Sequence, residues 1–169
     1  MRLLISGHQG FIGRHLYRRL SELKYEVDGW ELKDGKDIND LHPDDLRDGI
    51  RNTDTIFHLA AFPKVPFSVA FPDVTNYHNI RGTLQLLRAA VHAKVKRVVF
   101  SSSSSVYGNQ DKIPHKEDMP PNPMSPYAVQ KLTGEWYCKV FSELYGLETV
   151  SLRYFNVYGE DMPLDSSYS

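Results

Sequence analysis

The chain has 169 residues but only one cysteine, Cys138, so no disulfide can form within it. A free thiol of this kind suits a reducing compartment. No run of apolar residues approaches the roughly 20 that are needed to cross a bilayer. The N-terminal apolar residues lead into glycines instead of a signal-peptide cleavage site. We therefore expect a cytoplasmic protein without a membrane partner.

The sequence also lacks an excess of charge of either sign. Lysine and arginine together number 20, aspartate and glutamate number 21, and the formal net charge is −1. Nucleic-acid-binding proteins usually show a basic excess or a basic stripe, so we expect no nucleic-acid partner. The 7 histidines show no spacing typical of metal ligands, and we expect no metal site.

Short apolar runs alternate with longer amphipathic segments along the chain. The apolar runs lack polar alternation, as expected of strands that are covered on both faces. They predict five strands, at Arg2–Ser6, Glu26–Glu31, Thr55–Ala60, Arg97–Ser102 and Thr149–Tyr154. Strands that alternate with helices form parallel βαβ units with right-handed crossovers. We therefore predict one α/β domain over residues 1–169, with a doubly wound, Rossmann-type parallel sheet in the strand order 3-2-1-4-5.

Helical periodicity occurs between the strands, including a short segment at Pro43–Ile50. The clearest helix runs from Ser125, a natural N-cap, to Gly146, a natural terminator. Its apolar stripe consists of Val129, Leu132, Trp136, Val140 and Leu144. We expect Trp136 to lie in the core.

A glycine motif, Gly7-His8-Gln9-Gly10-Phe11-Ile12-Gly13, directly follows the first predicted strand and opens a helix. Small residues at such a turn let the backbone approach a pyrophosphate, and the helix N-terminus supplies free N–H groups and a positive dipole end. The spacing G-x-x-G-x-x-G differs from the G-x-G-x-x-G of the commonest dehydrogenases. By itself the motif is also compatible with a tight turn that carries incidental glycines.

An acidic residue, Glu31, ends the second predicted strand. A carboxylate at this position can accept hydrogen bonds from the ribose of an adenosine and repels a 2′-phosphate, which favours NAD over NADP. Lys33 counts against this preference, because a nearby cation can pair with a phosphate. Asp28 is a rival for the same role, but the period of two along a strand favours Glu31. The alternative is that Glu31 is a solvated strand end.

A tyrosine and a lysine, Tyr127 and Lys131, stand four residues apart on the clearest predicted helix and so share one face of it. An ammonium group near a phenol stabilises the phenolate and lowers the pKa of the phenol. The tyrosine can then exchange a proton with a hydroxyl group near neutral pH. The pattern is common by chance, and without the glycine motif a surface pair is the better interpretation.

A serine run, Ser101–Ser105, falls at the carboxyl end of the fourth predicted strand. In an open α/β sheet the ligand crevice lies outside the carboxyl ends of the strands. The serine hydroxyls can hydrogen-bond a reacting hydroxyl or carbonyl there. The alternative is a solvated, serine-rich strand exit.

Together these residues resemble the NAD-dependent nucleotide-sugar epimerase/dehydratase family, the extended short-chain dehydrogenases. The resemblance extends over essentially the whole chain. The segments that carry it are Ser6–Gly13, Asp37–Ile38, Phe57–Ala61, Asn79–Thr83, Val95–Gly108, Ser125–Lys131 and Arg153–Gly159.

The resemblance assigns roles to residues of this chain. It implies that Tyr127 transfers a proton, that Lys131 holds the nicotinamide ribose and tunes Tyr127, and that Ser103 is the catalytic serine, with Ser104 and Ser105 as rivals. The implied NAD-binding residues are Gly7, Gly10, Phe11, Ile12, Gly13, Glu31, Asp37, Ile38, Leu59, Ala60, Ala61, Asn79, Ser101, Tyr127, Lys131 and Tyr154. The implied substrate-binding residues are Ser103, Ser104, Tyr127 and Asn156.

The serine run also separates activities within the family. Resembling 4,6-dehydratases carry Asp-Glu where this chain has Ser104 and Ser105, and related decarboxylases commonly carry glutamate at the position of Ser105. The resemblance therefore implies a UDP-sugar 4-epimerase, which oxidises C4 transiently to a 4-keto sugar and returns the hydride. The alternatives are a nucleotide-sugar dehydratase or reductase of the same family, or a non-catalytic dinucleotide-binding fragment.

Two departures from the family pattern matter. His8 and Gln9 replace the smaller residues that are usual between the first two glycines. Family members also run about as far again beyond the segment that this chain matches, so we expect a chain in which the substrate domain is largely absent, with weak NAD binding and little or no turnover. The resemblance further implies a homodimer formed by helices near residues 74–93 and 126–146.

Overall fold

The computed structural model describes residues 1–31, 37–39 and 43–162. Its five strands are β1 (Arg2–Ser6), β2 (Glu26–Trp30), β3 (Thr55–His58), β4 (Arg97–Ser103) and β5 (Glu148–Tyr154). Its helices are α1 (Phe11–Glu22), α2 (Pro43–Gly49), α3 (Val65–Ala70), α4 (Pro72–Asn76), α5 (Gly82–His92) and α6 (Pro126–Tyr145), with a π-helical turn η2 (Tyr77–Arg81) and a 3-10 turn η3 (Ser104–Val106). The predicted strands are confirmed to within two residues at their ends.

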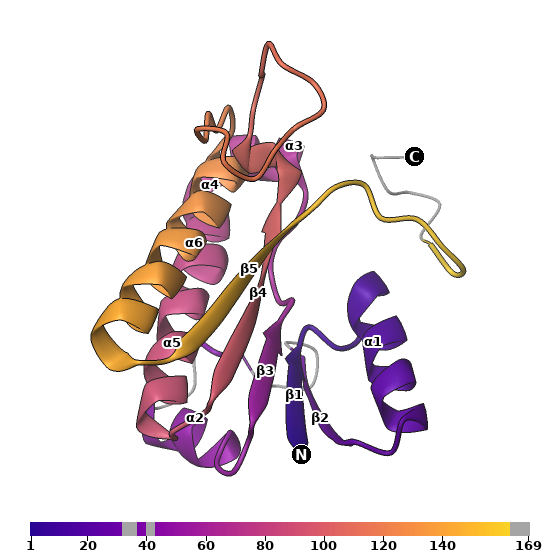
Figure 1. Cartoon of the computed structure of the whole chain (residues 1–169), viewed down its shortest axis with the longest axis vertical. Coiled ribbons are helices and arrows are strands. Elements are labelled where there is room, and N and C mark those ends of the chain that lie inside the picture. Colours follow the sequence, from indigo (N-terminus) through magenta and orange to yellow (C-terminus); the bar gives the residue numbers. More distant parts are fainter. Residues whose placement is uncertain (32–36, 40–42, 163–169) are drawn as a thin grey trace.

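All five strands run parallel in one sheet, and the strand order is β2-β1-β3-β4-β5. The predicted order 3-2-1-4-5 is therefore wrong, because β3 lies beside β1 and not beyond β2. The reason lies in the helix that connects them. Helix α2 packs against α5, on the face of the sheet opposite α1, and a right-handed crossover through that face carries the chain back past β1 (Figure 1).

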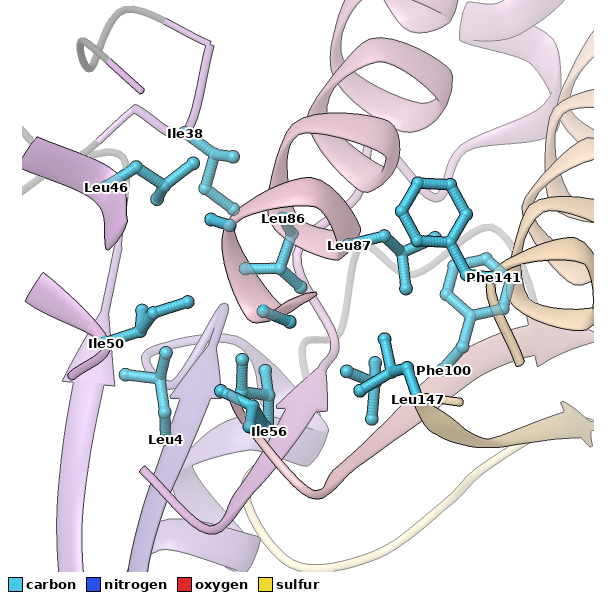
Figure 2. Packing of buried hydrophobic residues seen from close by; sticks show 14 of the residues in the cluster. Leu4, Ile38, Leu46, Ile50, Ile56, Leu86, Leu87, Phe100, Phe141 and Leu147 are labelled. Atoms are coloured by element: carbon cyan, nitrogen blue, oxygen red, sulfur yellow. The ribbon is translucent and has the colours of Figure 1, made fainter. Parts of the chain in front are cut away.

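The hydrophobic core lies between the sheet and the layer formed by α2, α5 and α6. Leu4, Ile56 and Phe100 project into it from the strands, and Leu86 and Leu87 meet them from α5 (Figure 2). On the other face of the sheet, α1 contacts β1 and β2. The central strands β1, β3 and β4 are therefore largely buried, which explains why their sequences lack polar alternation, whereas the edge strand β5 leaves Val150 and Leu152 exposed.

Helix α6 begins and ends where its sequence predicts. The Ser125 hydroxyl accepts a hydrogen bond from the Ala128 N–H at 3.2 Å, and Gly146 adopts a left-handed conformation with φ 69° after the last turn. The helix also approaches β4 closely, since a Cβ added to Gly134 would lie 2.4 Å from the Phe100 ring. A glycine at this position lets α6 bring its cleft-facing residues down onto the sheet.

The apolar stripe of α6 does not face the core. Trp136 is 53% exposed and Leu144 is 70% exposed, so the prediction that Trp136 is a core residue is wrong. The buried face of the helix instead carries a mixture of polar, small and aromatic residues, namely Tyr127, Ala128, Gln130, Lys131, Gly134, Cys138 and Phe141. Hydrophobic periodicity alone therefore predicts the wrong buried face, because the residues of α6 that pack against the sheet include Gln130, Lys131 and Gly134.

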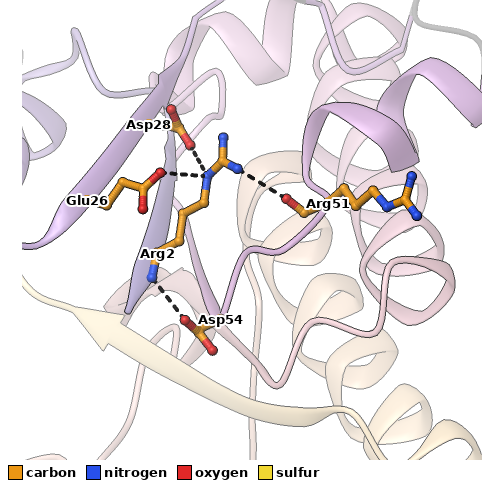
Figure 3. Close-up of polar contacts among 5 residues, drawn as sticks. All are labelled: Arg2, Glu26, Asp28, Arg51 and Asp54. Atoms are coloured by element: carbon orange, nitrogen blue, oxygen red, sulfur yellow. Dashed lines mark hydrogen bonds and ion pairs between the residues drawn. The ribbon is translucent and has the colours of Figure 1, made fainter.

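The amino-terminal end of the sheet is tied together by Arg2. The Arg2 guanidinium Nε donates to Asp28 of β2 at 2.7 Å, and the Arg2 backbone N–H donates to Asp54, just before β3, at 2.9 Å (Figure 3). A longer contact from Arg2 Nη1 reaches the carbonyl of Arg51 at 3.4 Å. These bonds fix β1 between its two neighbours at the end of the sheet that lies far from the glycine turn.

At strand β1 the direction in which successive strands are added to the sheet reverses. The chain passes from β1 through α1 to β2 on one side, and the remaining strands extend from β1 on the other side. In doubly wound sheets a crevice opens at such a switch point, beyond the carboxyl ends of the strands, and ligands bind there. The strand order therefore places a ligand site between the ends of β1 and β3.

Candidate functional site

A cleft of about 1130 Å³ opens at this switch point. The residues after β1, β3, β4 and β5 line it together with the start of α6. Of the residues predicted from the sequence, it brings together Gly7, Gly10, Phe11, Ile12, Gly13, Glu31, Asp37, Ile38, Leu59, Ala60, Ala61, Ser101, Ser103, Ser104, Tyr127, Lys131, Tyr154 and Asn156. Asn79 is the one predicted residue that does not line it.

The glycine turn is shaped by close contacts between backbone atoms. Gly7 has φ +77°, and a Cβ on it would lie 2.8 Å from the backbone nitrogen of Ala60. A Cβ on Gly13 would lie 2.1 Å from the carbonyl oxygen of Gly7. Side chains are thus excluded at both positions, and the turn needs glycine there.

The cleft meets α1 at its N-terminus. Gly10 is the N-cap, no side chain caps the helix, and its first turn carries no acidic residue. The first N–H groups of a helix have no partner within it, and the helix dipole makes this end positive. The position therefore suits a phosphate group, as the sequence predicts.

Glu31 stands at the edge of this turn. One of its carboxylate oxygens accepts a hydrogen bond from the Gln9 backbone N–H at 3.3 Å, which orients the carboxylate toward the cleft. The rival residue Asp28 does not line the cleft and instead accepts a bond from Arg2. Lys33 lies outside the described residues.

One end of the cleft is built around Asp37. The Asp37 carboxylate accepts a hydrogen bond from the Asn39 backbone N–H at 2.9 Å and lies 3.9 Å from the His78 ring nitrogen Nδ1. The ring of His78 in turn lies against that of Phe62, with the centroids 4.7 Å apart. Asp37, Ile38, Asn39, Phe62 and His78 all line the cleft, so this end combines apolar walls with hydrogen-bonding groups.

A buried histidine, His58, joins the ends of β1 and β3 beneath the cleft. Its Nε2 bonds Thr83 Oγ1 at 3.0 Å and its Nδ1 bonds Ser6 Oγ at 2.7 Å. Because Thr83 donates its own hydrogen to the Asn79 carbonyl, it accepts from His58, and Ser6 is then the donor to Nδ1. Burial, with a smaller effect of the Lys131 charge, lowers the pKa of His58 to about 3, so the ring stays neutral.

Lys131 is fully buried at the floor of the cleft. Its ammonium donates to the Ser101 carbonyl at 2.8 Å and lies 5.1 Å from the centre of the Phe100 ring and 5.8 Å from that of Tyr127. Burial lowers the pKa of Lys131 to about 8. The lysine therefore titrates close to neutral pH, beside the phenol that it is predicted to tune.

The end of β4 places serine hydroxyls opposite Tyr127. Ser103 is the N-cap of η3, and its hydroxyl oxygen accepts bonds from the Ser105 hydroxyl at 2.9 Å and the Ser105 N–H at 3.2 Å. Its own hydrogen is then available to a ligand. The hydroxyl of Ser101 is buried and has no hydrogen-bond partner within the described part of the chain.

After β5 the chain returns across the mouth of the cleft to α1. Tyr154 and Asn156 line the cleft on this path. The carbonyl of Glu160 bonds His15 at 2.9 Å, and the carbonyl of Asp161 accepts a bond from Arg14. The segment after β5 therefore closes one side of the site.

Several cleft residues had not been identified from the sequence. Phe62 lies two residues beyond the end of the predicted third strand, so the rule that ligands lie beyond strand ends is a signal that points to it. His115 belongs to the long loop that connects η3 to α6, and loops of such length are often functional. His78 lies on the π-helical turn, and its local sequence carries no comparable signal.

Within residues 1–31, 37–39 and 43–162, no group of three or more histidine, cysteine, aspartate or glutamate side chains is arranged to hold a metal ion. None of the helices described there is both long enough and apolar enough to cross a membrane.

A parallel sheet with a glycine turn at its switch point, and a tyrosine–lysine pair facing the same cleft, defines a dinucleotide-binding domain of the Rossmann type. The chain belongs to the NAD-dependent epimerase/dehydratase family, whose model matches residues 3–168. The sequence-based assignment to this family is confirmed.

Individual proteins of the family are similar to this chain in sequence and in structure. A putative UDP-glucose 4-epimerase of Methanocaldococcus jannaschii is 36% identical over 94% of this chain and 56% of its own length. Among solved structures, a UDP-N-acetylglucosamine 4-epimerase from Methanobrevibacter ruminantium, bound to UDP-N-acetylmuramic acid, is 36% identical with a TM-score of 0.89 over 99% of this chain and 59% of that one. A Thermus thermophilus UDP-glucose 4-epimerase in complex with NAD is 33% identical with a TM-score of 0.87, covering 94% and 56% of the two chains. The chain thus spans a little more than half the length of these relatives.

The low pKa of Lys131 predicts a specific dependence of stability on pH. An unfolded lysine keeps its proton up to about 10.5, whereas folded Lys131 releases it at about 8. Between these values the unfolded state binds more protons, so the wild type should gain about 3 kcal/mol of unfolding free energy relative to Lys131→Met as the pH rises. Chemical denaturation of both proteins across this range measures the difference, with Lys139→Met on the exposed face of α6 as the control. A difference between wild type and Lys131→Met that is independent of pH would contradict burial of the ammonium.

Proposed function

We propose that this chain is the NAD-binding domain of a UDP-sugar 4-epimerase. The observation that carries the proposal is that Tyr127 and Lys131 face the same cleft as the glycine turn, with serine hydroxyls opposite them. The names of the relatives support the substrate class, since both epimerase structures above act on or bind UDP-linked sugars.

The residues of the cleft fit NAD along its whole length. The α1 N-terminus and the glycine turn would hold the pyrophosphate, Glu31 would accept hydrogen bonds from the adenosine ribose, and the walls at Asp37–Ile38 and Ala60–Ala61 would enclose the adenine. At the other end, the unpartnered Ser101 hydroxyl and Tyr154 would meet the nicotinamide. NAD supplies the redox chemistry by accepting a hydride from C4 of the sugar and giving it back.

The protein residues would supply placement and proton transfer. Tyr127 would take the proton of the C4 hydroxyl as the sugar is oxidised to a 4-keto sugar. It would return the proton after the keto sugar has rotated to present its other face. Lys131 would stabilise the phenolate by its charge, with the Ser101 carbonyl holding the ammonium in place. Ser103 would donate a hydrogen bond to the reacting oxygen, and Ser104 and Asn156 would contact the rest of the nucleotide-sugar.

The alternatives within the family differ at the serine run. A dehydratase needs an additional acid and base to eliminate water, and the cleft has the hydroxyls of Ser104 and Ser105 at those positions. A reductase that prefers NADP is opposed by Glu31, whose carboxylate would repel a 2′-phosphate. A non-catalytic dinucleotide-binding protein would not require Ser103, Tyr127 and Lys131 to meet in one cleft.

The dinucleotide site is tested by placing a charge in the glycine turn. Gly10→Glu puts a carboxylate at the α1 N-terminus, where it occupies the pyrophosphate position and repels it, so NAD affinity should fall by more than about tenfold. Ser21→Glu adds the same charge at the far, exposed end of α1 and should leave NAD binding unchanged. Isothermal titration with NAD measures both variants. Equal affinities of wild type and Gly10→Glu would exclude this turn as the pyrophosphate site.

The reaction is tested by product analysis with several UDP-sugars and NAD, using the complete product of the reading frame that encodes this chain. We expect a C4 epimer to form without net reduction of NAD, and we expect Tyr127→Phe, which lacks the phenolic hydroxyl, to lose at least about 100-fold in kcat. Loss of water from the sugar would identify a dehydratase, and net consumption of NAD or NADPH would identify an oxidoreductase. Absence of any turnover in the complete product would favour a non-catalytic role.

We also propose that the protein forms a homodimer through α6. Support comes from its exposed apolar stripe, in which Val129, Trp136, Val140 and Leu144 are each at least 40% exposed. Trp136→Glu should raise the dimer dissociation constant by more than about tenfold, because buried aromatic anchors dominate such interfaces. Tyr25→Glu, at an exposed tyrosine away from α6, is the control. Sedimentation velocity measures the association, and a monomeric wild type at micromolar concentration would contradict the proposal.

A further inference from the structure

Two buried amide side chains, Asn79 and Gln130, connect the wall of the cleft to the helix that carries Tyr127 and Lys131. Asn79 lies on the π-helical turn η2, and Gln130 lies on α6 directly before Lys131. Each is only 3% exposed, and Thr75, which completes the cluster, is fully buried. Polar groups buried to this degree are usually hydrogen-bonded, because a buried polar atom without a partner costs free energy.

The orientation of the Asn79 amide follows from its contacts with Phe62. The Phe62 N–H donates to Asn79 Oδ1 at 2.8 Å, so the carbonyl side of the amide must face it. Asn79 Nδ2 then donates to the Phe62 carbonyl at 3.2 Å and to Gln130 Oε1 at 2.8 Å. Asn79 therefore clamps both backbone groups of Phe62, a residue of the cleft wall, and Gln130 holds the clamp.

The orientation of Gln130 is fixed from its other end. Its Nε2 donates to Thr75 Oγ1 at 2.8 Å and more weakly to the Pro72 carbonyl at 3.4 Å. The Thr75 hydroxyl gives its own hydrogen to the carbonyls of α4, the nearer of which is Pro72 at 3.1 Å, so it can only accept from Gln130. The acceptor and both donors of the Gln130 amide are thus in use.

The location of this cluster gives it a role beyond packing. π-helical turns within α-helices frequently occur at functional sites, and here the turn carries the asparagine that bonds the cleft wall. Gln130 is rigidly joined through one turn of α6 to Tyr127 and Lys131. The bond between Gln130 and Asn79 therefore contributes to the distance between the wall at Phe62 and the tyrosine–lysine pair, together with the bond from the Tyr127 N–H to Ser68 of α3.

We propose that Gln130 is a positioning residue, which holds the wall segment Leu59–Pro63 in register with Tyr127 and Lys131 so that both can contact the same dinucleotide. The role of the dinucleotide in this proposal rests on the proposed function. Gln130 does not line the cleft and acts through Asn79 and Phe62.

The first test replaces Gln130 by an apolar residue of similar size. Gln130→Leu removes the acceptor of one Asn79 hydrogen and the donor to the Thr75 hydroxyl oxygen. The hydrogen bonds from Asn79 to Phe62 are then held less firmly, so NAD affinity should fall about tenfold. Cys138→Ala is the matched control, because it also removes buried atoms from α6 but lies outside the cluster. Isothermal titration is carried out well below the unfolding temperature of both variants. A loss of affinity that is equal in the two variants would reduce Gln130 to a packing residue and overturn the proposal.

The second test uses Gln130→Glu, which should show a dependence on pH that the wild type lacks. A protonated carboxyl can accept from Asn79 and donate to Thr75, as the amide does, whereas a carboxylate can only accept. Burial favours the neutral form of the introduced group. The NAD affinity of Gln130→Glu relative to wild type should therefore recover at least about fivefold as the pH is lowered from 8 to 5.5, a range that is expected to include the raised pKa of the buried carboxyl. Gln130→Leu should not recover, and a Gln130→Glu variant that binds NAD like wild type at every pH would overturn the proposal.

The third test separates this proposal from the proposed function, because it needs no NAD. Amide hydrogen exchange of the chain alone measures how firmly the Phe62 N–H is held, and Gln130→Leu should speed its exchange at least about tenfold while Cys138→Ala does not. If the wild type binds no NAD, the proposed function fails, and the exchange rate of Phe62 still decides whether Gln130 holds the wall. Unchanged Phe62 exchange in Gln130→Leu would overturn the positioning role whatever the affinity for NAD.

Discussion

The site depends on one steric constraint, the direct contact of two backbone segments at the switch point of the sheet. Gly7 lies against the backbone of Ala60, and Gly13 lies against the carbonyl of Gly7, with no room for a side chain at either contact. This contact brings the end of β1, the end of β3 and the first turn of α1 to one place. Unpaired N–H groups and a positive helix end then face a cleft whose other wall is α6.

The rest of the site can be understood as support for this contact. His58 joins the two strand ends by hydrogen bonds that determine its tautomer, and it does so without a charge. Gly134 lets α6 settle on Phe100, which brings Lys131 within hydrogen-bond distance of the Ser101 carbonyl. The glycine turn is thus held against the end of β3, and α6 is held against β4, the strand that pairs with β3.

Much of this arrangement could be predicted from the sequence, because the relevant signals are local. The glycine spacing, the N-cap at Ser125 and the tyrosine–lysine spacing each concern a few neighbouring residues, and the rule that ligands bind beyond parallel strand ends brings them together. The strand order was not predicted correctly, since it depends on which face α2 covers, and that is decided by tertiary packing. The position of Trp136 was predicted wrongly for a related reason: the buried face of α6 includes Gln130, Lys131 and Gly134 beside Phe141, so its hydrophobic periodicity is weaker than that of the exposed stripe. The partners of Asn79 are 17 and 51 residues away in sequence, and no local pattern reveals such pairings.

The neutrality of His58 has an electrostatic consequence for the whole cleft. A protonated His58 ring would add a second positive charge near that of Lys131. This charge would vary with mild acidification and would change the electrostatic potential at the Tyr127 phenol. With the pKa of His58 held at about 3, the local potential from this pair of groups changes only when Lys131 itself loses its proton. Of these two groups only Lys131 then changes its charge near neutral pH, and the surrounding strands can pack tightly around a histidine that behaves as a fixed dipole.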